Sequence, residues 1–394
     1  MEEDKKYRLT DQSMLYNGKL IYRIEALKDF NGVRKGEYGG FVETEDNLSQ
    51  DGDCWVYGNA KLFDKSLVKD NACVYDNVVI MNNAMIYGNA KVYDYVIIKN
   101  DARVFDNAVV KDTAMVYGSA KVYDNAQVFE NAKVLEYAMV HNDAKVHGYA
   151  SVYGDCYIYD FADIYGNAKV CDQARVFYKA QVFGKAFVCG HSIVQGSAMI
   201  CGDAGLYGNS LVEGFARIFD NAHLYDNARI TSYAKVYGNA LIKGNSKVAG
   251  VAEVYGNAII DGDVGIYGTS KVFDNAQVRD NALIGEDAVV CGNALVNGYA
   301  VICKNSVVKS NGDFITFQKY WSDNSYITWT RSNDNWNDGE FHADKTTLLE
   351  EEHFYGTSEE LVKKAYKHSE KNGRQYEHLV KYVEETLKEE DNGE

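Results

Sequence analysis

The sequence is dominated by an aliphatic residue at every sixth position. From Val56 to Val308, all 43 of these positions hold Val, Ile or Leu, with no insertion or deletion. The residue four places after each aliphatic is small: of the 42 such positions from Ala60 to Ser306, 32 are Ala, six Ser, three Val and one Cys. Two turn-forming residues, usually Gly or Asp and then Asn or Asp, come just before the small one. The chain therefore repeats one six-residue unit over about two-thirds of its length.

The six-residue period excludes a helix over this region. A helix places neighbours three and four residues apart, and turn formers in every unit cannot keep one helical face apolar. Short strands of about three or four residues fit the pattern, because Gly and Asn adopt a left-handed backbone at little cost and can end each strand with a turn. The sequence therefore predicts a chain that turns a corner every six residues.

The unit resembles the hexapeptide repeat of left-handed parallel β-helices, in which the aliphatic residue is followed at the fifth position by Ala, Ser or Val. The resemblance implies that three units make one triangular coil of about 18 residues. The 43 units then make about 14 coils stacked at roughly 4.8 Å, a rod on the order of 65 to 70 Å long. The predicted fold class is an all-β solenoid, a single-stranded left-handed parallel β-helix with an N-terminal β cap and a small C-terminal α+β domain. Many unrelated activities occur on this scaffold, so the fold alone assigns no function.

Within that superfamily, the sequence resembles prophage-borne, YdcK-like hexapeptide proteins. The similarity is carried by the lead-in Gly39–Val42, the segment Asn47–Gln50, the entry Cys54–Ala60 and the many Tyr-Gly-Asn-Ala units. Such proteins are commonly labelled acyltransferases, but the resemblance itself assigns no reaction.

The repeat region, residues 54–313, is flanked by two parts that do not follow the six-residue rule. In residues 1–53, Asn17-Gly18 between two apolar segments predicts a tight β-hairpin. We expect residues 1–53 to form an N-terminal cap, because the unpaired N–H and C=O groups of the first coil would otherwise invite end-to-end association.

Residues 314–394 are predicted to form a small α+β domain with two helices that caps the other end of the rod. Two β-rich segments come first, and Trp329 in the second is interpreted as a core residue. Thr357 or Ser358 can cap the first helix, and Gly373 is expected to separate it from the second. Because irregular parts of a solenoid often carry function, the other aromatic candidates of this part are noted as well. They are Trp321, Trp336, His342 and His353.

The net charge of −16 argues against general nucleic-acid binding. Its distribution decides whether the rod imitates a nucleic acid: residues 1–55 carry −4, residues 56–313 carry −4 and residues 314–394 carry −8. A rod that imitates duplex DNA should display acidic rows along its length. Mimicry by the rod is therefore disfavoured, while an acidic contact through the C-terminal domain stays open.

The cysteines and the hydropathy pattern indicate a cytoplasmic protein. The eight cysteines form no C-x-x-C pair and no disulfide framework of a small secreted domain. Cys171 and Cys189 are separated by three repeat units and should stack on adjacent coils, where we expect two thiols rather than a disulfide. No apolar run approaches the roughly 18 residues of a membrane span, and the N-terminus lacks a signal-peptide core. The expected location is the cytoplasm, or the host cytoplasm if the gene belongs to a phage.

The residue after each aliphatic points outward, and residues three units apart share one face of the rod. On the face that starts at Tyr57, ten of 15 positions are Phe or Tyr, against five and six of 14 on the other two faces. This strip either stiffens the sheet as a stacking ladder, or forms a surface for a partner protein or a second subunit, or stacks carbohydrate or bases. The candidate binding surface consists of Tyr57, Tyr75, Tyr93, Phe129, Tyr165, Phe183, Phe219, Tyr237, Tyr255 and Phe273.

Acyl transfer is the alternative function. Hexapeptide acyltransferases generally form trimers, bind an acyl-CoA between adjacent coils and use a His as general base near loops that leave a corner. Here no corner carries such a loop. Among the histidines of the repeat, His191 in a turn is the best single candidate for a base. CoA would be the cofactor of this alternative, and no other cofactor is predicted.

No motif for a metal or a phosphate is apparent. Asn occupies 19 of the 42 second-turn positions, and we interpret this row as structural, because Asn stacked on Asn satisfies backbone groups at a left-handed corner. The Asp-rich stretches lack the spacing of a calcium loop, and no zinc motif appears. The sequence therefore predicts no metal site.

The function predicted from the sequence is that of a phage- or prophage-type binding or scaffolding protein. Its partner is expected to be a protein, either a host factor that the chain modulates or antagonises or a second copy of the chain. A membrane partner is not expected, and direct nucleic-acid binding is disfavoured. An acyl-CoA-dependent acyltransferase and a trimeric fibre component are the alternatives, and the second is disfavoured by the caps at both ends.

Overall fold

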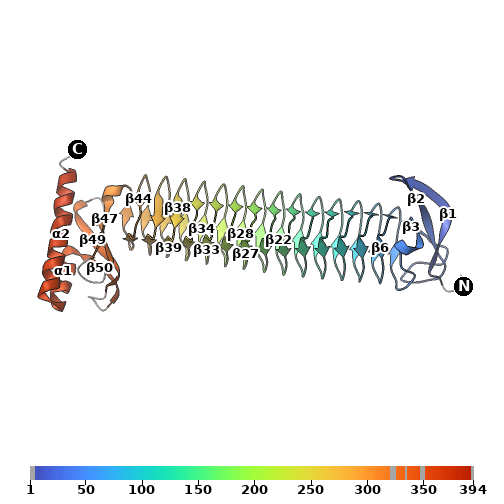
Figure 1. The fold of residues 1–394 in the computed structure, drawn as a ribbon, viewed down its shortest axis with the longest axis horizontal. Coiled ribbons are helices and arrows are strands. Elements are labelled where there is room, and N and C mark those ends of the chain that lie inside the picture. Colours follow the sequence, from blue (N-terminus) through green and yellow to red (C-terminus); the bar gives the residue numbers. More distant parts are fainter. Residues whose placement is uncertain (1–4, 320–324, 333–334, 347–350, 392–394) are drawn as a thin grey trace. The chain divides into compact units, whose positions relative to one another are not determined.

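The fold is a parallel β-solenoid of about 15 turns of roughly 18 residues, with a small C-terminal region of helices and sheet (Figure 1). The structure is a computed structural model, and it describes residues 5–319, 325–332, 335–346 and 351–391. The predicted fold class is therefore confirmed. The chain divides into two compact units, residues 1–208 and 209–394, and each is described by itself.

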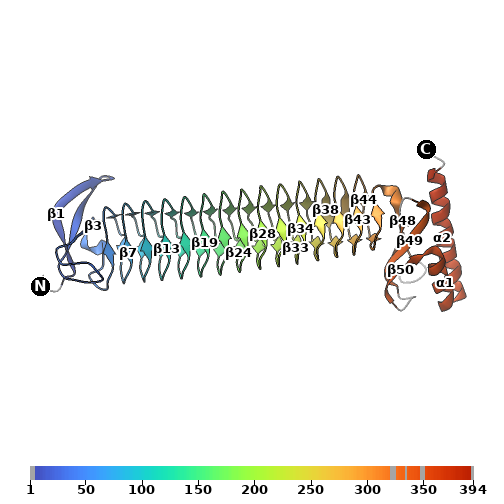
Figure 2. The same cartoon turned by 180° about the vertical axis from the view of Figure 1, so that it is seen from behind.

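Each six-residue unit forms one very short strand. Strands β4 to β46 each consist of the repeat's aliphatic residue and the residue before it, from β4 (Trp55–Val56) to β46 (Val307–Val308). Only β38 (Ile259–Gly262) and β41 (Gln277–Asp280) extend two residues further. Within each compact unit, a strand pairs in parallel with the third strand after it, so partners lie one coil apart, as the repeat predicts. Figure 2 shows the coils of each unit from behind.

The aliphatic and small positions fill the interior of the coils. All 43 aliphatic side chains have no exposed surface, and the small residues between them are buried as well. The backbone on both sides of each strand donates to the next coil, as when Trp55 N bonds Ala72 O at 3.1 Å and Tyr57 N bonds Val74 O at 2.7 Å. Proline lacks the N–H that these ladders need, which explains why the sequence contains none.

Each corner is made by a residue with a left-handed backbone. Asp64 has a φ of 58° and Gly88 a φ of 67°. Where this residue is Asp, its carboxylate in most cases also accepts the N–H of the equivalent residue one coil further on. Asp64 Oδ2 accepts Asn82 N at 3.1 Å, and Asp226 Oδ2 accepts Gly244 N at 3.0 Å. The preference for Asp therefore reflects both the turn and the connection between coils.

The N-terminal part contains the predicted hairpin. Strands β1 (Tyr7–Tyr16) and β2 (Lys19–Ala26) are antiparallel, with Tyr16 opposite Lys19. Positive φ values of 47° at Asn17 and 76° at Gly18 fit the tight turn that this dipeptide favours. Strand β2 pairs with β3 (Tyr38–Val42), which pairs in parallel with β5 (Lys61–Leu62), so the hairpin continues a sheet of the solenoid.

Two glycines let β3 approach the first coil closely. A Cβ at Gly39 would lie 2.6 Å from Val56 O, and one at Gly40 would lie 2.5 Å from Ala60 O. Side chains other than hydrogen cannot occupy these positions without displacing the backbone of the coil. The Gly-Gly-Phe-Val lead-in is therefore a packing requirement of the junction between cap and coil.

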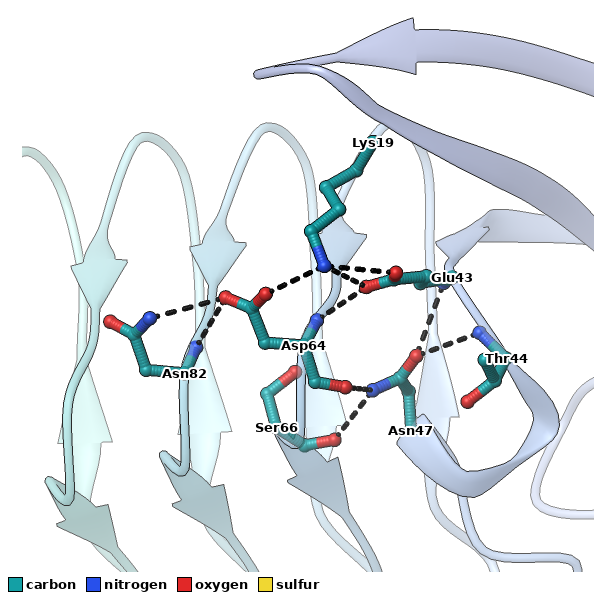
Figure 3. Close-up of polar contacts among 7 residues, drawn as sticks. All are labelled: Lys19, Glu43, Thr44, Asn47, Asp64, Ser66 and Asn82. Atoms are coloured by element: carbon teal, nitrogen blue, oxygen red, sulfur yellow. Dashed lines mark hydrogen bonds and ion pairs between the residues drawn. The ribbon is translucent and has the colours of Figure 1, made fainter.

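Polar side chains connect the cap to the first corners (Figure 3). Asn47, in the 3-10 helix η1 (Glu45–Asn47), accepts Thr44 N at 2.9 Å and donates to Ser66 O at 2.9 Å and to Asp64 O at 3.0 Å. Lys19 Nζ, from the hairpin, lies 3.0 Å from both Glu43 Oε1 and Asp64 Oδ1. These contacts satisfy backbone groups that a preceding coil would otherwise satisfy.

The C-terminal region begins after the 3-10 helix η2 (Asn311–Asp313) with an antiparallel sheet in the order β47-β48-β49-β50. Its strands and helices are β47 (Phe314–Gln318), β48 (Tyr326–Ser332), β49 (Asn335–Thr346), β50 (Glu351–Thr357), α1 (Ser358–His368) and α2 (Glu370–Asp391). Strand β48 has two buried faces. Thr328 and Thr330 face the last coils, where Val301 N donates to Thr328 Oγ1 at 2.9 Å, while Ile327 and Trp329 pack in the core with α1 and α2. The interpretation of Trp329 as a core residue is confirmed.

The boundary between the two helices differs from the prediction. Thr357 caps α1, accepting Glu360 N, as expected. Gly373, however, lies inside α2 and does not separate the helices, which are divided at Ser369. A Cβ at Gly373 would overlap the Tyr366 ring. The glycine is therefore needed for close packing of α1 on α2, and the prediction that it breaks the helix was wrong.

The remaining candidates of the C-terminal part cannot be placed. Trp321 lies outside the described residues, and so do the side chains of Trp336, His342 and His353. Their roles stay predictions.

Candidate functional site

The face that starts at Tyr57 carries columns of stacked rings. Neighbouring ring centroids lie 4.5 to 5.2 Å apart, and their planes deviate by at most 10°. The columns are Tyr57–Tyr75–Tyr93 and Phe129–His147–Tyr165–Phe183 in the first unit, and Phe219–Tyr237–Tyr255–Phe273 in the second. Within a column each ring covers its neighbours, so mainly ring edges meet solvent. This geometry supports the stiffening interpretation, and a binding role of the ten residues stays a prediction.

The tyrosines of these columns are uncharged at neutral pH, and burial raises the pKa of their hydroxyls further above the ordinary value of 10. The pKa of Tyr57 rises to about 12 and that of Tyr237 to about 12. The columns are therefore apolar stacks with neutral hydroxyls at their edges. A Lys occupies one interruption, where Lys111 Nζ lies 5.3 Å from the centre of the Phe129 ring and covers the end of that column.

A second face carries a longer column that the sequence analysis did not single out. Six rings stack without interruption at 4.7 to 5.2 Å, and Lys69 Nζ lies 5.2 Å from the centre of the first ring. The rings are those of Tyr87, Phe105, Tyr123, His141, Tyr159 and Phe177. The count of Phe and Tyr missed the column because His141 supplies one of its rings. Counting His as a ring at the spacing of one coil would have found it.

The Asn and Asp side chains of the corners bond to one another along the coils. Asn71, Asn89, Asn107 and Asn125 each donate from Nδ2 to the next Oδ1, at 3.1 to 3.3 Å. Asn89, Asn107 and Asn125 border an open depression of about 570 Å³ between corner residues from Gly88 to Asp143. The amides bond to one another rather than to backbone groups, which supports a structural role for the Asn row.

His191, the predicted base, is an exposed corner residue. Among the described residues, none places a carboxylate within ion-pair distance of its ring. His147 has the arrangement expected of an oriented histidine: Nε2 lies 3.1 Å from Asp163 Oδ1, and Nδ1 lies 3.8 Å from Glu130 Oε2. The separation of 16 positions between His147 and Asp163 is the signal that could have revealed the pair, since it joins adjacent coils diagonally.

Two of the eight cysteines lie side by side on the outer face of adjacent coils. None of the eight forms a disulfide, and all lie in the described part of the chain, in agreement with the expectation of reduced thiols. Sγ of Cys171, Sγ of Cys189 and a carboxylate oxygen of Asp172 all lie within 4.8 Å of one another. Burial raises the pKa of both thiols, that of Cys189 to about 12.

Exposed aromatic side chains gather at corners rather than on the ladder faces. In the first unit, Phe161 and Tyr178 are 61% and 56% exposed, and Phe161 N bonds Tyr178 O at 2.9 Å. In the second unit, Phe215, Tyr233 and Val251 occupy one corner of three successive coils and are 51 to 56% exposed. We name these the Tyr178 patch and the Tyr233 patch. The sequence analysis missed both, because it followed the outward strand positions and treated the turn residues only as turn formers.

The comparisons with known proteins agree with the repeat. No protein-family model matches the chain. It is 31% identical over 85 residues to the uncharacterized acetyltransferase YdcK of Escherichia coli (strain K12), an alignment that covers 19% of this chain and 26% of YdcK. The match thus spans about a quarter of that relative. Together with the parallel β-solenoid, it fits the hexapeptide-repeat β-helix superfamily.

The corners of this repeat, which lie in the described part of the chain, carry no extra loops. Strands β4 to β46 follow one another at six-residue intervals over residues 55–308, all of which are described, so no corner there carries an extra loop. An acyl-CoA site, as implied for acyltransferases of this class, would have to lie on the coil surface itself. Among the described residues, no helix is long and apolar enough to cross a membrane. The prophage origin and the cytoplasmic location stay predictions.

Proposed function

We propose that this hexapeptide-repeat β-helix is a scaffold that binds another protein, and that it does so through the exposed corner aromatics of the Tyr178 and Tyr233 patches. The proposal keeps the binding role predicted from the sequence and moves it from the ladder faces to the corners. The ring faces of the ladders are covered by one another, whereas the corner rings are more than half exposed. Exposed aromatic residues are enriched in the energetic centres of protein interfaces.

The observation that carries the proposal is the backbone of Tyr178. This residue has a φ of 56°. Of the 42 residues at this turn position from Gly58 to Lys304, it is the only aromatic one. A left-handed backbone costs a bulky residue about 1 to 2 kcal/mol, and Asp at this position would remove much of that cost while supplying a carboxylate acceptor to the next coil. A strained and exposed aromatic side chain beside exposed Phe161 is a feature that stability alone does not favour.

The Tyr233 patch adds a second surface of the same kind. The Phe215 and Tyr233 rings stack at 4.9 Å, and Val251 follows on the next coil. Asn, Asp and other polar residues are the usual occupants of this turn position. Three successive apolar residues therefore replace polar ones in a column that faces solvent.

The experiment compares three versions of the full chain as bait. The test variant is Phe161→Ser with Tyr178→Asp. The control is Tyr149→Asn, which removes an isolated exposed corner ring that is 65% exposed and installs the commonest residue of its position. We expect wild type and control to retain the same protein from a host lysate and the test variant to lose it by tenfold or more, while light scattering reports any self-association.

Equal retention by all three versions would contradict a role for the Tyr178 patch. Loss in the control as well as in the test variant would indicate non-specific adhesion to exposed rings. Because Asp is well suited to the backbone at position 178, the test variant is expected to melt at the same temperature as wild type or higher. A loss of binding is then not explained by unfolding.

Acyl transfer is the second candidate. It is favoured by the similarity to YdcK, which is described as an uncharacterized acetyltransferase, and by the His147–Asp163 pair, in which a carboxylate orients an imidazole as general bases require. The test measures particle mass and thermal shift with acetyl-CoA and CoA. A trimer stabilised by several degrees, with the shift reduced in His147→Gln and unchanged in His191→Gln, would favour this candidate. A particle indifferent to both ligands would contradict it.

A further inference from the structure

Cys171 and Cys189 form the only cysteine pair of the sequence that is separated by one coil. Cys171 follows β23 (Lys169–Val170) and Cys189 follows β26 (Phe187–Val188), two strands that pair with Val170 opposite Val188. The two thiols therefore lie next to each other on the outer face of adjacent coils. They are nevertheless 3% and 9% exposed, so neighbouring side chains cover them.

A carboxylate is held beside the two sulfur atoms. Asp172 follows Cys171 in the turn, and its Oδ2 accepts Gly190 N at 3.0 Å, which fixes the orientation of the carboxylate. One oxygen of Asp172 and both Sγ atoms lie within 4.8 Å of one another. Tyr153 occupies the position equivalent to Cys171 on the preceding coil. Two sulfur donors and one oxygen donor thus converge from two adjacent coils.

We propose that Cys171, Cys189 and Asp172 bind one Zn²⁺ ion. Two thiolates and a carboxylate are ligands that Zn²⁺ takes in tetrahedral sites, and the fourth position is available to water. With Zn–S bonds of about 2.3 Å, two sulfur ligands of a tetrahedral ion are on the order of 3.8 Å apart, which is within the spread of the cluster. As each Zn–S bond forms, the thiol releases its proton to solvent, so no oxidant or reductant is needed.

A sequence search for zinc motifs does not find this site, because its ligands are spaced by the coil and not by a loop. The usual motifs place two cysteines about two to four residues apart on one turn. Here the parallel register performs the same task across three repeat units. The site would tie two adjacent coils of the solenoid together.

The test uses Co²⁺ as a spectroscopic probe on the full chain, purified without a metal-binding tag and treated with a chelator. We expect one Co²⁺ per chain, an intense thiolate-to-cobalt absorption in the near ultraviolet, and loss of that absorption when Zn²⁺ is added. Cys189→Ser should weaken the absorption and lower Co²⁺ affinity by about tenfold or more. Asp172→Asn keeps an acceptor for Gly190 N and should lower affinity while leaving the fold intact.

Cys291→Ser is the matched control. Cys291 also follows a repeat aliphatic and is also 9% exposed, but has no cysteine one coil away. It should bind Co²⁺ as wild type does. The proposal is overturned if wild type shows no thiolate absorption at micromolar Co²⁺, or if Cys291→Ser loses as much of it as Cys189→Ser. Should Cys189→Ser fail to fold, Asp172→Asn decides: undiminished affinity in that variant also overturns the proposed ligand set.

Discussion

The coils of the repeat and the N-terminal cap solve the same problem in opposite ways. In the coils, the N–H groups of the strands bond to carbonyls of the next coil, and the same bond recurs from unit to unit. The cap has no preceding coil to use, so individual side chains take the place of one. Asn47, fully buried, bonds four backbone groups, and Lys6, 1% exposed, donates to three carbonyls. The repeat therefore distributes its stability over many equivalent bonds, whereas the cap concentrates it in a few residues.

Lys6 is the residue on which the cap depends most. Its Nζ lies 3.2 Å from Asp51 O, 3.1 Å from both Gly52 O and Cys54 O, and 3.2 Å from Cys54 Sγ. The Phe30 ring covers it, with the ring centre 5.3 Å from Nζ. A single buried ammonium thus satisfies the backbone that leads into the first coil.

Replacing Lys6 with Met should produce the largest loss of stability. The change keeps most of the length of the side chain but leaves buried carbonyls without a donor, and we expect the free energy of unfolding to fall by about 3 kcal/mol. Lys133→Met, at an exposed position in β17 (Lys133–Val134), is the control and should change it by less than about 0.5 kcal/mol. Urea unfolding monitored by circular dichroism measures both. Equal losses would show that the cap is no more sensitive than the coil.

Asn47→Ala should lower the free energy of unfolding by less than Lys6→Met does, but by more than an alanine substitution at any Asn of the corner ladder. The amide of Asn47 is buried and makes four hydrogen bonds to backbone groups, so we expect the free energy of unfolding to fall by about 2 kcal/mol. Asn107, by contrast, is exposed and bonds Asn125 at 3.3 Å, so Asn107→Ala should cost about 0.5 kcal/mol. Hydrogen exchange at the first coils should rise only in Asn47→Ala. A uniform rise along the coils in both variants would contradict the distinction.

The sequence predicts the coils better than the cap because the coils repeat. The buried state of Val56 and its 42 equivalents, the left-handed turn at Asp64 and the pairing of Asn71 with Asn89 all follow once residues three units apart are known to be neighbours. The contact of Lys6 with residues 51–54 has no period, so no local pattern predicts it.

Residues whose roles depend on contacts without a period were also missed or misinterpreted. Gly373 has the pattern of a helix break, and only the position of the Tyr366 ring shows that it is a packing glycine. Tyr178 is visible in the sequence as an aromatic turn residue, but its exposure and its φ of 56° come from the structure. Stacking of Cys171 on Cys189 was predicted from the spacing, whereas the approach of Asp172 depends on its turn.

A substitution at a single corner of the repeat should lower stability only slightly. The loss has two parts, one from the left-handed backbone and one from the hydrogen bond to the next coil. Asp226 has a φ of 57° and accepts Gly244 N at 3.0 Å. Asp226→Gly retains the favourable backbone and loses the acceptor, so we expect a loss of about 1 kcal/mol. Asp226→Ala loses both and should cost about 2 kcal/mol. Thermal unfolding of the two variants measures the difference, and a glycine variant less stable than the alanine variant would contradict this account of the corner.

The ion pair between Lys19 of the hairpin and Asp64 of the first corner should contribute least to stability. Its pH dependence should distinguish it from an ion pair on the coil. Partial desolvation raises the pKa of Asp64, but hydrogen bonds from Lys19 and Asn82 outweigh it, so this pKa lies below its usual value. Hydrogen bonds to Asp64 and Glu43 raise the pKa of Lys19. The contribution of Asp64 to stability is therefore complete above its unfolded pKa of about 3.9, and it is lost as the pH falls through the lower folded pKa. The contribution of Lys19 to stability is lost as the pH rises through a folded pKa above about 10.4.

The difference in melting temperature between wild type and Lys19→Met should be constant from about pH 5 to 9 and shrink on either side. Lys185→Met is the control from the repeat, because the Lys185–Asp203 pair is more exposed and longer, at 3.7 Å. Its difference in melting temperature from wild type should be small and should not change with pH. If the two variants respond to pH alike, the cap has no special electrostatic attachment to the coil, and its stability depends on buried groups such as Lys6 and Asn47 alone.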